Sequence, residues 1–107
     1  MSGVSNPYRY MYEHVAASQT AQVLGGTGAV GDYLHRIIIT VATAATSVVQ
    51  IVDGTGAGIL THTILPNIVG GGVGVYNVEI NAVSQNGAWK ITTGAGSEVM
   101  AVGIFSA

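Results

Sequence analysis

The sequence has no cysteine, only two prolines and very few charged side chains. Without cysteine, the fold has no disulfide framework and no thiolate metal site. Charged residues make up 7% of the 107 residues, whereas about 25% is usual for a soluble domain. Three basic residues and a net charge of -2 argue against nucleic-acid binding, which depends on neutralising phosphates. The composition therefore argues against a disulfide-stapled protein, a thiolate metal protein and a nucleic-acid-binding protein before any motif is considered.

A long unbroken hydrophobic run is also missing. The most apolar stretch, residues 32–53, interrupts its aliphatic side chains with threonine, serine and glutamine. A membrane-spanning helix needs about 20 predominantly apolar residues, so no membrane partner is expected. The first residues lack a basic region followed by an apolar core, so no secretory signal peptide is predicted. We expect synthesis and folding in the cytoplasm.

The shortage of charge has two interpretations. In the first, threonine, serine, asparagine and glutamine cover the surface, as in many small β proteins. In the second, much of the surface contacts other subunits, because the centres of obligate interfaces are apolar and poor in charge. Both interpretations stay open at this point.

β-Branched residues dominate the apolar segments, which favours strands over helices. Residues 37–41 and 48–52 are predicted strands joined by a loop over 42–47. Residues 75–83 alternate between apolar and polar side chains, which is typical of a half-exposed antiparallel strand. Other predicted strands are one long or two short strands within 13–24, and strands over 59–65, 88–93 and 97–105. No segment has the apolar spacing of a helix.

Turn signals separate these strands about every 8 to 12 residues. Asp53-Gly54 and Asn86-Gly87 are hairpin signals, and the second predicts that residues 75–83 pair with residues 88–93. The run Gly26–Gly31 formally matches a dinucleotide-binding fingerprint, but it precedes a β-branched strand instead of a helix. It therefore predicts a loop whose glycines allow positive φ and close backbone approach.

The whole pattern predicts an all-β chain, an antiparallel β-sandwich or jelly roll of seven to eight short strands without substantial helix. Residues 1–12 are expected to form a tyrosine-rich arm, followed by a β-sandwich domain over residues 13–107. In an extended arm, Tyr8, Tyr10 and Tyr12 lie on one face. The arm is either an edge strand of its own domain, a contact with a neighbouring subunit, or disordered.

Candidates for catalysis and metal binding are few. His14, His35 and His62 lie far apart in the sequence and lack a second ligand type at a suitable spacing. Each is expected to have a hydrogen-bonding or interface role. Glu79 and Glu98 could act as a carboxylate pair in glycoside hydrolysis, but both lie on predicted exposed strand faces. The sequence therefore predicts no enzyme, no catalytic residue, no metal site and no cofactor.

Three segments resemble a group of small all-β virion-associated proteins of tailed bacteriophages. They are the glycine-rich stretches Ser18–Leu34 and Leu65–Tyr76 and the tryptophan-containing stretch Gly87–Gly96. The resemblance implies a non-enzymatic structural protein of the virion, made in the host cytoplasm, that decorates or cements the capsid. It implies a homo-oligomer, a trimer or dimer, whose partners are its own copies and the major capsid protein or another virion protein. Tyr8, Tyr10 and Tyr12 are then the expected oligomer or capsid contacts.

A second possible function belongs to another class, a receptor- or glycan-binding module of a tail or head fibre. It predicts an exposed cluster of aromatic and polar side chains at one end of the sandwich, around Tyr76 and Trp89. The alternation of Trp89 with Lys90 instead favours a buried position for the indole ring, with its N–H hydrogen-bonded.

Overall fold

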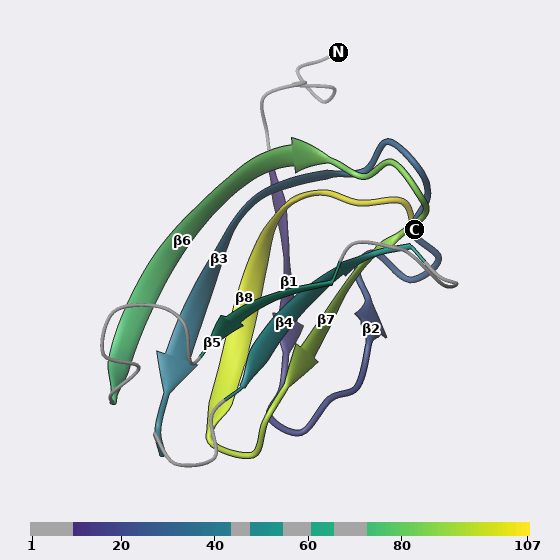
Figure 1. The fold of residues 1–107 in the computed structure, drawn as a ribbon. Helices are drawn as coiled ribbons and strands as arrows, with labels where there is room; N and C mark the ends of the chain where they lie inside the picture. Colours follow the sequence, from purple (N-terminus) through teal and green to yellow (C-terminus); the bar gives the residue numbers. More distant parts are fainter. Residues whose placement is uncertain (1–9, 44–47, 55–60, 66–72) are drawn as a thin grey trace.

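The computed structural model describes residues 10–43, 48–54, 61–65 and 73–107, and it is all-β (Figure 1). The described residues form eight strands, β1 (Met11–Val15), β2 (Gln22–Val23), β3 (Tyr33–Val41), β4 (Val49–Asp53), β5 (Thr61–Leu65), β6 (Gly74–Val83), β7 (Trp89–Thr93) and β8 (Ser97–Ile104). The predicted class and number of strands are confirmed. Over the described ranges, no helix is long and apolar enough to cross a membrane.

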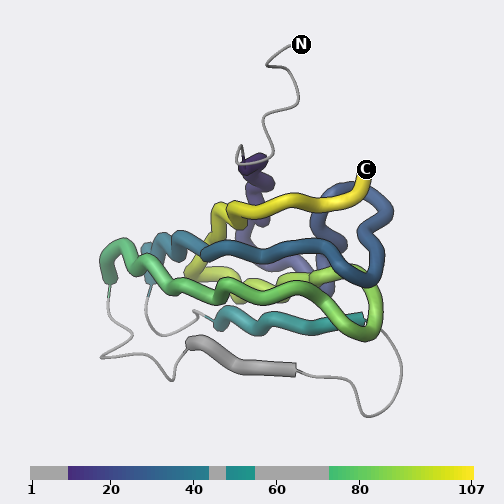
Figure 2. Tube along the Cα trace, turned by 90° about the horizontal axis from the view of Figure 1, so that it is seen from above, coloured from purple at the N-terminus to yellow at the C-terminus, as the bar shows by residue number. Residues whose placement is uncertain are grey.

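The strands form two four-stranded antiparallel sheets, β1-β8-β3-β6 and β2-β7-β4-β5. In Figure 2 the blue β3 and green β6 run side by side, and the teal β4 of the other sheet runs below them. The pairs β1–β8, β2–β7, β3–β6 and β4–β5 make the chain one long hairpin rolled over itself. This connectivity is that of a jelly roll.

The core lies between the sheets and is built from the predicted β-branched segments. On β3, Ile37, Ile39 and Val41 point inward and are buried, while Val49 and Ile51 of β4 face them from the other sheet. The remaining buried apolar residues include Val15, Leu24, Leu34, Trp89, Ile91, Val99, Ala101 and Phe105. Period-two alternation therefore places the densest apolar stretch of the sequence at the centre of the fold.

The Asn86-Gly87 hairpin prediction is wrong. β6 pairs with β3, whereas β7 pairs with β2 and β4, so the turn carries the chain from one sheet to the other. The carboxylate of Asp53 accepts hydrogen bonds from the backbone N–H groups of Gln85, at 2.9 Å, and Asn86, at 3.2 Å. These bonds tie the turn to the end of β4, so long-range anchoring overrides the local hairpin signal.

The glycine loop before β3 has the predicted conformation. Gly25 has a φ of +90° and Gly28 a φ of +65°. A Cβ on Gly28 would lie 2.2 Å from the Cβ of Ala88, and one on Gly25 would lie 2.5 Å from the carbonyl oxygen of Ser106. The glycines therefore let this loop pack closely on β7 and on the end of the chain.

Asp32 joins four segments at the end of this loop. Its buried carboxylate accepts hydrogen bonds from the backbone N–H of Ala29, and from the N–H and hydroxyl of Ser106, at 3.0, 3.0 and 2.7 Å. Its carbonyl oxygen accepts from the N–H of Ser84 at 2.8 Å and from the indole N–H of Trp89 at 2.9 Å. Trp89 is 3% exposed, which confirms its predicted place in the core.

Replacing Asp32 with alanine leaves the Ala29 N–H and both Ser106 donors without their acceptor. We expect the free energy of unfolding to fall by at least about 2 kcal/mol, because hydrogen bonds to charged groups are strong and unmade ones are costly. Urea unfolding followed by the fluorescence of Trp89, the one tryptophan, measures the change. Glu98→Ala is the control and should cost at most about 1 kcal/mol, since the Glu98 carboxylate makes an exposed contact with His14. Equal losses in the two variants would contradict the role assigned to Asp32.

Candidate interaction surface

The outer face of the β1-β8-β3-β6 sheet carries a continuous group of apolar and aromatic side chains. On β8, outward residues alternate with the buried Ser97, Val99 and Ala101. The register places outward neighbours in rows across the sheet. We call this surface the aromatic–apolar face, and it consists of Tyr12, Tyr33, Ile38, Val83, Met100, Val102 and Ile104.

Several members of this face are left exposed in the described part of the chain. Tyr12 is 73% exposed, Val83 is 52% exposed and Ile104 is 43% exposed. Tyr12 stands opposite Val102, and Tyr33 stands between Ile104 and Val83. Single exposed apolar residues are ordinary, but a contiguous apolar patch marks an interaction surface.

A bulge in β3 shapes one end of the face. The pairing register of β3 shifts between Leu34 and Arg36 with both neighbouring strands. Leu34 and Ile37 are both buried, so the two residues between them, His35 and Arg36, both turn outward. β-Bulges commonly redirect a side chain in this way. The shift therefore adds an imidazole ring to the outer surface.

His35 belongs to a cluster of aromatic and polar side chains. Its ring stacks on that of Tyr10, with ring centroids 4.6 Å apart and planes inclined by 22°. Its Nδ1 lies 2.9 Å from Oδ1 of Asn81, which also accepts a 2.8 Å hydrogen bond from the Tyr33 hydroxyl. Because an amide oxygen only accepts, this hydrogen bond requires the tautomer with the proton on Nδ1. Asn81 has a φ of +51°, a conformation that asparagine tolerates better than most residues.

The electrostatics of this cluster act on Tyr33. Partial burial, followed by the neighbouring Tyr10 and the Glu79 carboxylate, raises the pKa of the Tyr33 hydroxyl above its ordinary value. The neutral hydroxyl is therefore favoured, and it is this form that donates to Asn81.

The predicted contact tyrosines divide into two groups. Tyr10 and Tyr12 lie at the same edge of the sheet, and both are exposed, while Tyr8 lies outside the described residues. β1 begins at Met11 and pairs with β8, so Met11 and Tyr12, assigned to the arm from the sequence, are residues of the edge strand. The sequence predicted the tyrosines as contacts, but it did not predict their apolar neighbours on β8.

A signal for those neighbours was nevertheless present in the sequence. Along β8, apolar residues occupy both faces, with Val99 and Ala101 inward and Met100, Val102 and Ile104 outward. A strand with one solvated face normally alternates apolar and polar residues, whereas a strand covered on both faces is apolar throughout. The composition of β8 is thus that of a strand covered on both faces.

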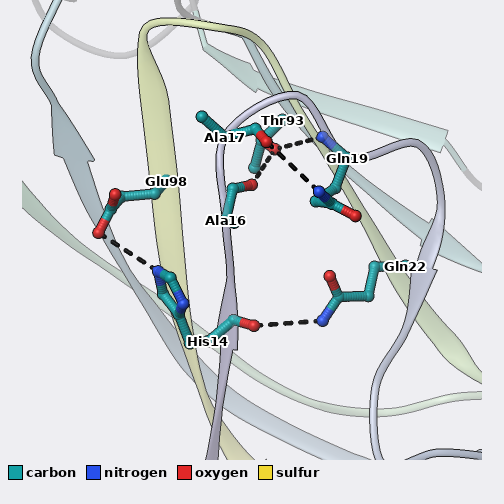
Figure 3. A network of polar contacts seen from close by, with 7 residues as sticks. All are labelled: His14, Ala16, Ala17, Gln19, Gln22, Thr93 and Glu98. Atoms are coloured by element: carbon teal, nitrogen blue, oxygen red, sulfur yellow. Dashed lines mark hydrogen bonds and ion pairs between the residues drawn. The ribbon is translucent and has the colours of Figure 1, made fainter.

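The remaining candidates do not form a reactive site. His14 Nε2 lies 3.3 Å from Glu98 Oε1, in an exposed pair on β1 and β8 (Figure 3). Glu79 stands opposite Arg36 on β6, separated from Glu98 by β3, so the two glutamates are not a pair. His62 lies on β5, in the other sheet. Within the described part of the chain, no three metal-ligating side chains come together.

A shallow depression lies beside Glu98 and Ser97, at the end of the same sheet. Its cavity volume is about 60 Å³, and it opens widely to solvent. Pockets that hold small molecules usually have about 300–1,000 Å³ and bury most of the ligand. The extended aromatic–apolar face is therefore a better candidate than this depression.

Comparison of the chain with family models, with curated proteins and with solved structures returned no match. The virion role implied by the sequence resemblance therefore remains a prediction.

The raised pKa of Tyr33 predicts that one tyrosine keeps its proton above about pH 10, where exposed tyrosines ionise. The tyrosinate absorbance of the folded protein, recorded against pH, should show a late step that is missing in Tyr33→Phe. Because the folded state holds this proton more tightly than the unfolded chain, the free energy of unfolding should fall as the pH rises above about 10. Tyr12→Phe should retain the late step. A single tyrosine transition, unchanged in Tyr33→Phe, would refute the assignment.

Proposed function

We propose that the chain is a non-enzymatic structural protein of a phage virion, a capsid decoration or cement protein that assembles as a homo-oligomer. The aromatic–apolar face is the observation that carries the proposal. The resemblance of the glycine-rich segments to small virion proteins gives the proposal its biological setting.

The composition of the face supports a contact with protein. Its middle rows contain Met100, Val102 and Ile38, with the exposed Tyr12 on one side of Val102 and Arg36 of β3 on the other. The other charged residues lie around these rows, with the His14–Glu98 pair towards one end and Glu79 on the edge strand β6. Protein interfaces share this composition, because their cores are enriched in tyrosine, methionine and arginine.

The other sheet provides a comparison within the same molecule. Its buried residues on β4 and β7 alternate with outward Gln50, Val52, Lys90 and Thr92. This outer face mixes polar, charged and aliphatic side chains, and none of these four is strongly exposed. Among the side chains that the structure describes, only the first of the two outer faces concentrates exposed aromatic and apolar groups, which supports a one-sided attachment.

The rigidity of the scaffold suits a cement function. The hydrogen bonds around Asp32 tie the loops at one end to the core, so the face is held in shape before a partner binds. Pre-organisation reduces the entropic cost of association. On a capsid, the same modest contact repeats many times, and an oligomer gains strength from multivalent attachment.

One observation supports the alternative function, a receptor- or glycan-binding module. Trp89 is buried and cannot be the platform, but Tyr10, His35 and Asn81 form an exposed aromatic and polar cluster. Binding on a glycan array that is lost in Tyr10→Ala, with the fold intact, would favour this alternative over the cement function.

The double substitution Tyr12→Ser with Ile104→Ser removes exposed apolar area from the face without touching the core. We expect it to weaken cosedimentation with particles that lack this protein by at least about tenfold, because exposed aromatic anchors commonly dominate binding. Val30→Ser is the matched control, since Val30 is 63% exposed but lies in the loop before β3, away from the face. Wild-type protein that does not bind such particles, and is monomeric by light scattering, would overturn the proposed function.

A further inference from the structure

β6 is the longest strand and an open edge of its sheet. It has ten residues, and among the described strands it pairs only with β3; Figure 1 shows it at the rim of the molecule. The other three edge strands, β1, β2 and β5, have five, two and five residues. A long edge presents unpaired N–H and C=O groups, which proteins usually protect with lysine, proline or a covering segment. β6 contains neither lysine nor proline.

The side chains of β6 are incompletely covered on both faces. Its inward residues Tyr76, Val78 and Ile80 pack against the core but are only partly buried. The inward residues of β3 and β8, by contrast, are buried. On the outer face, Val75 is 67% exposed. The β6 edge, which no other described strand pairs, therefore carries apolar side chains that a further strand would cover more fully.

We propose that two copies of the chain pair through their β6 strands, antiparallel and about a two-fold axis. This inference deepens the proposed function, on whose self-assembly it rests, by naming the surface that makes the oligomer. A two-fold contact uses the same strand twice, so it closes as a dimer and does not continue into a fibre. It also satisfies the backbone edge that each copy leaves open.

The sequence of β6 favours one register for this pairing. Side chains opposite each other must lie on the same face, so a residue on the axis pairs with itself. An axis at Glu79 would place two carboxylates opposite each other, which is destabilising. An axis at Val78 places Asn77 opposite the partner's Glu79, which can accept its amide hydrogen bond. The same axis places Tyr76 opposite the partner's Ile80, so apolar groups meet on the inner face.

The bulge limits how far the pairing extends. Asn81 has a positive φ and is held by His35 and Tyr33, so the regular part of the edge ends at Ile80. The stretch from Gly74 to Ile80 remains for the partner, and Val78 lies near its middle.

Such a dimer would change the shape of the candidate interaction surface. The two four-stranded sheets would become one continuous sheet of eight strands. The aromatic–apolar faces of the two copies would then lie on the same side of this sheet. A particle would be contacted by two linked faces, which raises avidity without any new contact chemistry.

A symmetric cysteine provides the sharpest test, because the chain has no cysteine of its own. Val78→Cys places the new thiols opposite each other on the axis. Paired antiparallel residues have Cα atoms about 4.5–5.5 Å apart, within the range that a disulfide spans. We expect mild oxidation to convert Val78→Cys to a covalent dimer, whereas the exposed loop variant Thr20→Cys stays largely uncrosslinked. Equal crosslinking of the two variants would overturn the β6 pairing.

Two alternative substitutions of opposite charge at one position test the register without changing the core. Asn77→Glu puts a second carboxylate opposite the partner's Glu79, and Asn77→Lys puts an ammonium group there. Sedimentation equilibrium over a dilution series should show a dimer that is at least about tenfold weaker for Asn77→Glu and not weakened for Asn77→Lys. Thr20→Glu and Thr20→Lys are controls, and both should match the wild type. Equal effects of the two Asn77 variants would overturn the proposed register.

Two outcomes separate this inference from the proposed function. A dimer that forms without a Val78→Cys crosslink and without an Asn77 charge effect overturns the β6 edge but leaves the cement function standing. A crosslinked β6 dimer that fails to bind particles supports the edge and overturns the cement function. A wild-type chain that stays monomeric at every concentration overturns the β6 inference.

Discussion

Hydrogen bonds between acidic side chains and loop backbone hold the loops of this fold to its core, and Asp32 is the main example. Its carboxylate binds the glycine loop and the end of the chain, and its carbonyl oxygen binds Trp89 of the other sheet. Asp53 holds the turn after β6, and Glu13 accepts from the backbone N–H of Gly25 at 2.7 Å. Three of the five acidic residues are thus bonded to loop backbone. Most of the acidic side chains are therefore used in internal hydrogen bonds, and few remain to solvate the surface.

This use of the acids leaves the surface with little charge to solvate it. The effect is concentrated on one sheet, because β3 and β8 carry apolar side chains on both faces. Their inward residues build the core, and their outward residues, such as Ile38 and Met100, build the aromatic–apolar face. A strand that is apolar on both sides, as β8 is, has the composition of a strand covered on both faces. The core and the proposed assembly surface therefore arise from the same strands.

Much of the fold was predictable, but the candidate surface was predictable only in part. Alternation identified β6 and its inward residues, and the spacing of Tyr10 and Tyr12 placed them on a common face. The cluster that Tyr10 joins could not be foreseen, because it needs the bulge that turns His35 outward and the left-handed Asn81 on another strand. Both depend on pairing between distant segments. The hairpin prediction at residues 86–87 was wrong for the same reason, because pairing with distant strands decides the partners of β6 and β7.

The sequence by itself determined the all-β class, the approximate strands, the buried tryptophan and the glycine loop, because these follow from side-chain shape, alternation and local φ preference. Only the tertiary structure decided which strands pair, which acids are internal and which sheet keeps an apolar outer face. Sheet order depends on contacts between residues far apart in the chain, such as Asp32 with Ser106 and Tyr33 with Val83. Local pattern specifies that a strand has two faces, but only packing decides what covers each face.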